Sequence, residues 1–146
     1  MCLAVALRGA VPFASLTGIE AVVFPLLRQV GDTPLYQQFM AMRSDYFQAF
    51  EAGDKEAARM VVDFFGGAGT FDALPQRMRD YIVATTPTHY LDMHSGFDPA
   101  QAAYAVISLP TLIIRGERTH PASARSAEIL SRAVPGASLA KTEPAL

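Results

Sequence analysis

The stretch LPTLIIRGERTHPASARSAEILSRAVPG, Leu109–Gly136, contains features of a strand, a turn and a helix in that order. Thr111–Arg115 is an apolar run of the kind that a parallel sheet buries on both faces. Gly116–Thr119 follows as a turn. Pro121–Val134 places apolar residues at helical spacing and ends at a Pro-Gly pair, which is typical of a helix that stops there. This order predicts one strand-helix unit of a parallel sheet.

Two more strands are expected, one on each side of this unit in the sequence. Leu16–Phe24, LTGIEAVVF, is an apolar run that Glu20 interrupts and Pro25 ends. Ser138–Lys141 has the composition of the start of a third strand. The strands that flank the long middle region are therefore expected to be parallel neighbours, with their carboxyl ends at the same edge of the sheet.

The middle region, from about Thr33 to Val106, is predicted to be a helical hairpin or bundle. Apolar residues recur there at three- and four-residue spacing, so they share one helix face. The positions expected to be buried on this basis are Leu35, Phe39, Met42 and Tyr46. A later helix that starts near Asp72 is expected to end before Pro87, because the residue before a proline avoids helical geometry. Asp98-Pro99 is expected to open one more helix.

This order of elements resembles the α/β-hydrolase superfamily from its sixth strand almost to its eighth. LTGIEAVVFPLLRQVGD is similar to the sixth strand and the start of the cap, and VVDFFGGAGTFDALP to a cap segment. PTLIIRGER and PGASL are similar to the seventh strand and the start of the eighth. The resemblance implies a helix-rich α/β protein with a partial α/β-hydrolase fold, in which two or three parallel strands carry a large helical cap insertion. Residues 1–30 and 108–146 would be remnants of the core, and 31–107 the cap.

A hydrolase of this superfamily needs a nucleophile, a histidine base and an acid that orients the histidine. The 146 residues contain no Gly-x-Ser-x-Gly or Gly-x-Asp-x-x-Gly motif, and KTEPAL resembles the residues that precede the family's histidine. The usual acid follows the seventh strand as Gly-x-x-Asp, but here Thr119 takes that place after Gly116. One dehalogenase branch has a glutamate after the sixth strand instead, and Glu20 matches it. Glu20 is therefore expected to be the inherited catalytic acid; the alternative is a strand-end carboxylate in solvent.

Further site residues are expected from position and type. His120 is a second catalytic candidate, since it could reach Glu20 from the neighbouring strand, although it lies on the wrong loop for the family's base. The candidates for substrate binding are Phe24, Phe39, Phe65 and His94. The segment THYLDMH holds His89, Asp92 and His94, but histidines five residues apart do not share a helix face well, so surface or cap-lining histidines are favoured over a metal site. No metal or cofactor is expected.

Composition narrows the possible partners. The formal net charge of −2, without a basic stripe, argues against nucleic acid. No apolar run reaches the roughly 18 residues of a membrane span. The single cysteine, Cys2, fits a reducing cytoplasm. Apolar residues make up 51% and charged residues 18%, which favours burial of some apolar surface against another copy, as in a homodimer.

Two functions follow as expectations. By resemblance the chain is hydrolase-related and of esterase type, acting on an ester or similar bond of a small apolar substrate, but without a complete triad among its 146 residues. The alternative is a non-catalytic helical binding or assembly module that dimerises through exposed sheet edges.

Overall fold

The computed structural model describes residues 2–142, which divide into two compact units. The core unit comprises the residues up to Tyr36 and those from Phe97 onward. The helical unit is Gln37–Gly96, and it lies within the range 31–107 expected for the cap. Each unit is described below by itself.

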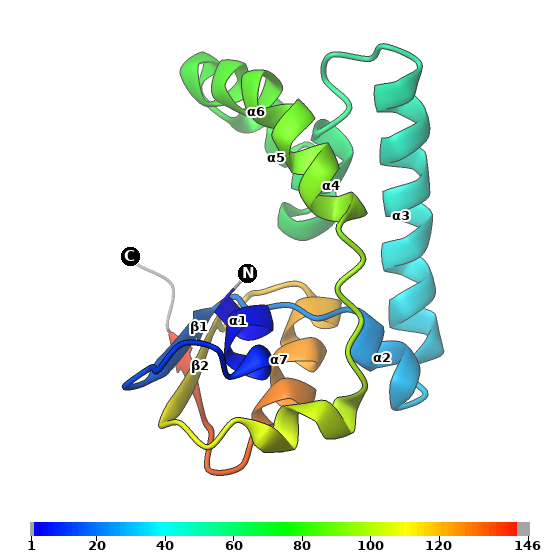
Figure 1. Ribbon diagram of the computed structural model, residues 1–146. Helices are drawn as coiled ribbons and strands as arrows, with labels where there is room; N and C mark the ends of the chain where they lie inside the picture. The colour runs from blue at the N-terminus through cyan, green and yellow to red at the C-terminus, as the bar shows by residue number, and fades with distance from the viewer. Residues whose placement is uncertain (1, 143–146) are drawn as a thin grey trace. The chain divides into compact units, whose positions relative to one another are not determined.

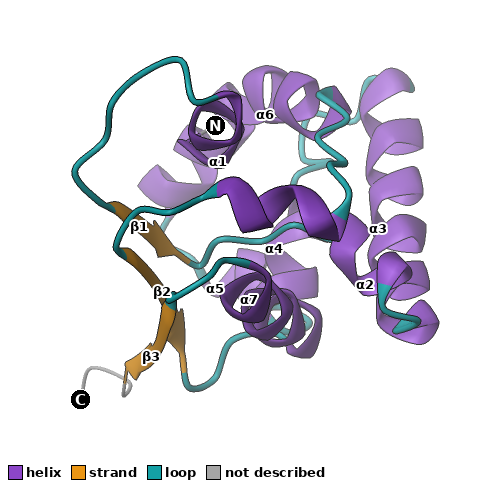
Figure 2. Cartoon of the chain, turned by 60° about the horizontal axis from the view of Figure 1, so that its bottom comes forward, coloured by secondary structure: helices purple, strands orange, loops and turns teal. Residues whose placement is uncertain are grey.

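The core unit contains a three-stranded parallel sheet in the order β1-β2-β3 (Figure 2). The strands are β1 (Leu16–Ile19), β2 (Thr111–Gly116) and β3 (Ser138–Thr142). Leu16 is paired with Thr111 at the start of the β1–β2 ladder, and Leu112 with Ser138 at the start of the β2–β3 ladder. Parallel pairing of the first two strands, and the presence of the third, are confirmed.

The core unit also contains helices. They are α1 (Cys2–Arg8), α2 (Pro25–Gln29), the first turn of α3 (Thr33–Glu51), the 3-10 helix η1 (Gln101–Val106) and α7 (Pro121–Ala133). α7 lies against the sheet (Figure 1). The hydroxyl of its buried Ser126 accepts a hydrogen bond from the backbone N–H of Val23 at 2.7 Å. The side chains at the centre of this unit are Leu26, Leu27, Tyr104, Ile113, Leu130 and Val134.

β2 is not buried equally on its two faces. Thr111, Ile113 and Arg115 are buried, whereas the alternate residues are only half-buried. The expectation of burial on both faces is therefore wrong for the core unit by itself. α7 covers one face of β2. An apolar run needs cover on the other face as well, but that face is partly open to solvent in this unit.

The helical unit consists of the rest of α3 with α4 (Arg59–Gly66), α5 (Thr70–Ala73) and α6 (Gln76–His94). Its core includes Met42, Tyr46, Ala57, Ala58 and Val61. The expected helical hairpin or bundle is present, and Met42 and Tyr46 are buried as predicted. Leu35 and Phe39 are half-buried, because they lie in the first two turns of α3, before its most enclosed part.

Three boundaries differ from the expectation. β1 ends at Ile19, well before Phe24, because Glu20 adopts a left-handed backbone and Pro25 starts α2. α6 continues through Pro87, where the sequence predicted an end. The segment expected as a helix from Asp98 is the short 3-10 helix η1.

Pro87 is accommodated because neighbouring contacts hold the backbone on both sides of it. A proline cannot donate to the carbonyl four residues earlier. The hydroxyl of Thr86 donates to the carbonyl of Ile82 at 2.8 Å, and the carbonyl of Thr86 accepts from the hydroxyl of Tyr46 at 3.3 Å. Packing against α3 therefore outweighs the local preference.

Candidate functional site: a carboxylate at the end of β1

Glu20 lies where β1 ends, at the carboxyl edge of the parallel sheet. Its backbone N–H donates to the carbonyl of Ile114 at 2.8 Å and extends the β1–β2 ladder by one bond. Among residues 2–142, Glu20 is the one residue other than glycine with a positive φ, at 48°. Such a conformation costs a side-chain-bearing residue about 1 kcal/mol, and residues held in it cluster at functional sites.

The Glu20 carboxylate is held by the turn that follows β2. Oε1 accepts from the backbone N–H of Gly116 at 2.6 Å, and Oε2 accepts from the hydroxyl of Thr119 at 2.6 Å. Both bonds have a charged acceptor, and such bonds are shorter and stronger than neutral ones. The side chain is exposed, yet both of its oxygens have fixed partners. The expected proximity of Glu20 to Gly116–Thr119 is therefore confirmed.

This contact joins the two positions where the resemblance to the α/β-hydrolases leads us to expect an acid. Thr119, at the first of them, donates its hydroxyl to the carboxylate of Glu20 at the second. Gly116 permits the approach, because a Cβ built there would lie 3.3 Å from Glu20 Oε1. The carboxylate of Glu20, directly after β1, thus reaches the region that an acid in the turn after β2 would occupy.

His120 follows this turn directly and has a structural contact of its own. Its Nδ1 accepts from the backbone N–H of Ala122 at 3.2 Å, and it thereby caps the start of α7. Burial lowers the pKa of His120, which favours the neutral ring that this acceptor role requires. The Nδ1 atom is engaged by the cap, so Nε2 is the atom with which His120 would act on another group.

The four residues predicted to bind substrate belong to different units. Phe24 is buried in the core unit. Phe39 and Phe65 lie in the helical unit and are joined through Phe64, at ring-centroid distances of 6.4 Å and 5.0 Å. His94 is exposed at the end of α6 and stacks on Phe47 at 4.2 Å. Within the helical unit, Phe39 and Phe65 therefore share one aromatic cluster, whereas His94 stacks on a different ring.

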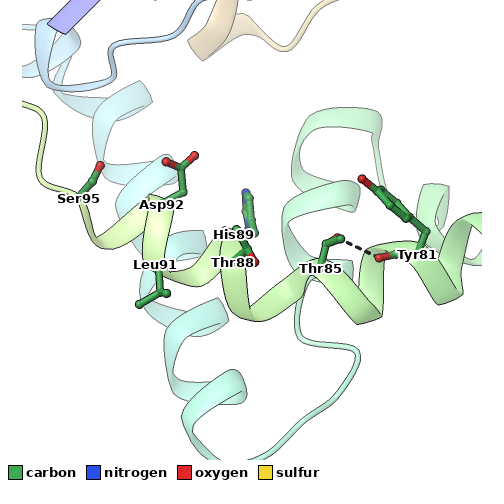
Figure 3. A pocket seen from close by; sticks show the side chains of 7 residues that line it. All are labelled: Tyr81, Thr85, Thr88, His89, Leu91, Asp92 and Ser95. Carbon is green, nitrogen blue, oxygen red and sulfur yellow. Dashed lines mark hydrogen bonds between the residues drawn. The ribbon is translucent and has the colours of Figure 1, made fainter. Parts of the chain in front are cut away.

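Two of the cavities in the described residues are lined by other side chains. One, of about 350 Å³ in the core unit, runs beside β1 and α1; its lining includes Cys2, Leu3, Leu16, Ile19 and Phe97. The other is an open groove of about 670 Å³ on α6 in the helical unit (Figure 3). Sequence reasoning did not predict the α6 groove as a binding site. The only signal in the sequence was the pair His89 and Asp92, whose spacing places both on one side of a helix.

The described residues set limits on metal binding and membrane insertion. Within residues 2–142, no group of three or more histidine, cysteine, aspartate or glutamate side chains is arranged to hold a metal ion. No helix in this part of the chain is both long and apolar enough to cross a membrane.

Comparison with known proteins supports the architecture. No family model matches the sequence, and no curated protein matches it. The structure is similar to that of an alpha/beta hydrolase from Sphaerobacter thermophilus DSM 20745, with a TM-score of 0.62 and 17% sequence identity. The match covers 99% of this chain and 56% of that chain, so this chain spans little more than half of the hydrolase's length. The described residues thus form a helix-rich, partial α/β-hydrolase fold with three parallel strands.

Proposed function

We propose that this chain carries the acid of an α/β-hydrolase-type site, in which Glu20 orients a histidine base for hydrolysis of an ester or similar bond in a small apolar substrate. The observation that carries the proposal is the position of the Glu20 carboxylate at the carboxyl edge of a parallel sheet, fixed by Gly116 and Thr119. Ligands of open parallel sheets bind at this edge. The fold similarity to an alpha/beta hydrolase supports the same class of reaction.

As the acid of such a site, this carboxylate has to meet two requirements. It must be oriented, and it must still accept a bond from an imidazole N–H. A carboxylate offers about four acceptor positions on its two oxygens. The bonds from Gly116 and Thr119 use one on each oxygen and leave one on each for a histidine. The carboxylate then stabilises the imidazolium that forms when the base takes the nucleophile's proton.

The base can come from a second copy of the chain. The three histidines of the sequence are His89, His94 and His120. In a homodimer, a histidine of one copy can approach Glu20 of the other and complete an acid-base pair. Glu20 is then the acid of the pair, and the nucleophile is the residue or water that the pair activates.

Turnover of an activated ester such as p-nitrophenyl acetate by the purified chain tests this function. Glu20→Gln is the informative variant, because an amide can keep one bond to Gly116 and one to Thr119 while the charge is lost. We expect kcat/KM to fall by about tenfold or more, since a general acid-base pair contributes about 10²–10⁴-fold. Glu117→Gln, in the exposed turn beside the site, is the matched control and should leave kcat/KM unchanged. Equal turnover by the wild type and both variants would remove Glu20 from the reaction.

A second function is favoured by the two edges of the sheet. β1 and β3 are both edge strands of the described sheet, and Ile19 at the end of β1 is 72% exposed. An apolar edge with unpaired backbone groups recruits another strand. We propose as the alternative that the chain is an assembly module, in which a second copy pairs along such an edge. Absence of esterase turnover together with a dimer in light scattering would favour this alternative, and a stable monomer at high concentration would contradict it.

A further inference from the structure

The groove on α6 has an unusual composition for a surface hollow. Its seven lining residues all come from α6 and its C-cap: Tyr81, Thr85, Thr88, His89, Leu91, Asp92 and Ser95 (Figure 3). This set contains one carboxylate, one imidazole and no lysine or arginine. The charge of the lining is therefore negative whenever the imidazole is neutral.

The contacts of Tyr46 are the basis for assigning the proton of the His89 ring to one nitrogen. The hydroxyl of Tyr46, which is fully buried, donates to the carbonyl of Thr86 at 3.3 Å. A carbonyl can only accept, and a hydroxyl has one proton, so with this donation we assign the ring proton to Nδ1 in the 3.3 Å contact between the hydroxyl and His89 Nδ1. In the neutral ring, Nε2 then carries the lone pair. His89 thus offers a hydrogen-bond acceptor at Nε2.

A second acceptor lies beside it. Asp92 is one helical turn further along α6, and its carboxylate projects from the same side of the helix as the His89 ring (Figure 3). Burial lowers the pKa of His89, and the nearby Asp92 charge opposes this shift only in part, so the neutral ring is favoured. The groove therefore presents two acceptors, one of them charged, to whatever occupies it.

At the other end of the groove, Tyr81 offers an aromatic surface that is 66% exposed. An α-helix rises about 1.5 Å per residue, so the eight positions from Tyr81 to His89 span about 12 Å. A molecule that uses both ends must carry its donor group and its apolar group some distance apart.

We propose that the α6 groove binds a small organic cation, in which an ammonium group is joined by a short carbon chain to an aromatic or apolar group. The ammonium donates to His89 Nε2 and to the Asp92 carboxylate, and the apolar group packs on Tyr81. The seven lining residues belong to the helical unit and Glu20 belongs to the core unit, so binding of the cation does not require hydrolysis at Glu20.

The test is a titration of the full chain with 4-phenylbutylamine, followed by NMR. We expect saturable shifts of the His89 and Asp92 signals with a dissociation constant of about 1 mM or below. 4-Phenylbutanol, which lacks the charge, and 4-phenylbutyrate, which reverses it, should bind at least about tenfold more weakly. Equal binding of the alcohol and the amine, or no saturable shift, would overturn the proposal.

Variants locate the site. Asp92→Asn should weaken amine binding by about fivefold or more, and His89→Phe should do the same, since it keeps a ring but removes the acceptor. Asp80→Asn removes a carboxylate from the same helix outside the groove, and it should change binding by less than about twofold. Circular dichroism confirms that each variant is folded. A larger loss in Asp80→Asn than in Asp92→Asn would show that the amine responds to general charge and would refute the site.

The tautomer is tested separately from binding. Nitrogen-15 correlation spectra of His89 should show a protonated Nδ1 and an unprotonated Nε2 at neutral pH. In Tyr46→Phe the ring should shift toward the other tautomer, and 4-phenylbutylamine should bind more weakly. A protonated Nε2 in the wild type would contradict the arrangement of acceptors on which the proposal rests.

Discussion

At the scale of the residue, the site depends on an exchange between two positions. By resemblance a carboxylate is expected at Thr119, and Glu20 supplies a carboxylate from the end of the neighbouring strand. The two side chains form a hydrogen bond, so a second carboxylate at position 119 would lie beside the first and be repelled by it. The proximity of the two positions could be predicted from the sequence, because the carboxyl ends of adjacent parallel strands share one edge.

Thr119→Asp tests the exchange. It places a second carboxylate beside Glu20, and the repulsion should lower the free energy of unfolding by about 1 kcal/mol at neutral pH, a modest value because the site is exposed. In a Glu20→Gln background the cost should disappear, since the amide can donate to the new aspartate. Urea denaturation of the four proteins gives the coupling energy. Equal costs in both backgrounds would mean that positions 20 and 119 do not interact.

His89 gives a second prediction, on pH. Its pKa is lowered in the folded chain, chiefly by burial, so the folded state binds the proton less well than the unfolded state does. Well above pH 6.5, the ordinary pKa of histidine, His89 is neutral in both states and does not change the free energy of unfolding. As the pH falls through 6.5, the unfolded state is protonated first, so the free energy of unfolding falls. His89→Gln removes this contribution. Thermal unfolding of both proteins across that range should show a steeper loss for the wild type toward acid; parallel curves would refute the burial of this ring.

At the scale of the element, the bounds that were predicted correctly and those that were predicted wrongly have different physical causes. β2, α7 and β3 lie where the sequence predicted them, because apolar runs, Pro121 and the Pro-Gly pair all act locally. β1 was predicted too long, since the apolar residues after Glu20 pack in the core without being a strand. The end predicted before Pro87 was wrong because contacts with Tyr46, 40 residues away, are invisible to local rules. For the same reason, the role of His89 could not be derived from THYLDMH alone.

Pro87→Ala measures what α6 loses through its internal proline. Alanine restores the N–H that can donate to the carbonyl of Val83 and has the higher helix propensity. Part of the gain is offset because proline restricts the unfolded chain. We expect a net stabilisation of about 1 kcal/mol in urea denaturation followed by circular dichroism. Pro75→Ala, at the residue before α6, has no helical bond to gain and should not stabilise the protein. Destabilisation by Pro87→Ala would show that the proline shapes the packing on α3.

At the scale of the whole molecule, the chain consists of a small parallel sheet with its helices and a separate helical unit inserted between β1 and β2. The sequence predicted this plan because a helical region separates two strand signals. Pairing of a second copy along a sheet edge stays a prediction, because such pairing leaves no pattern in one sequence. The proposed function depends on one feature of this plan, the Glu20 carboxylate at the edge shared by β1 and β2.

The amide proton of Gly116 tests that feature most directly. A backbone N–H that donates to a carboxylate at 2.6 Å should resonate at unusually low field and exchange slowly with solvent, although the turn is exposed. In Glu20→Ala the Gly116 signal should move upfield and exchange faster, while Glu117→Ala should leave it in place. An ordinary Gly116 shift in the wild type, unchanged by Glu20→Ala, would contradict the contact and with it the assignment of Glu20 as the acid.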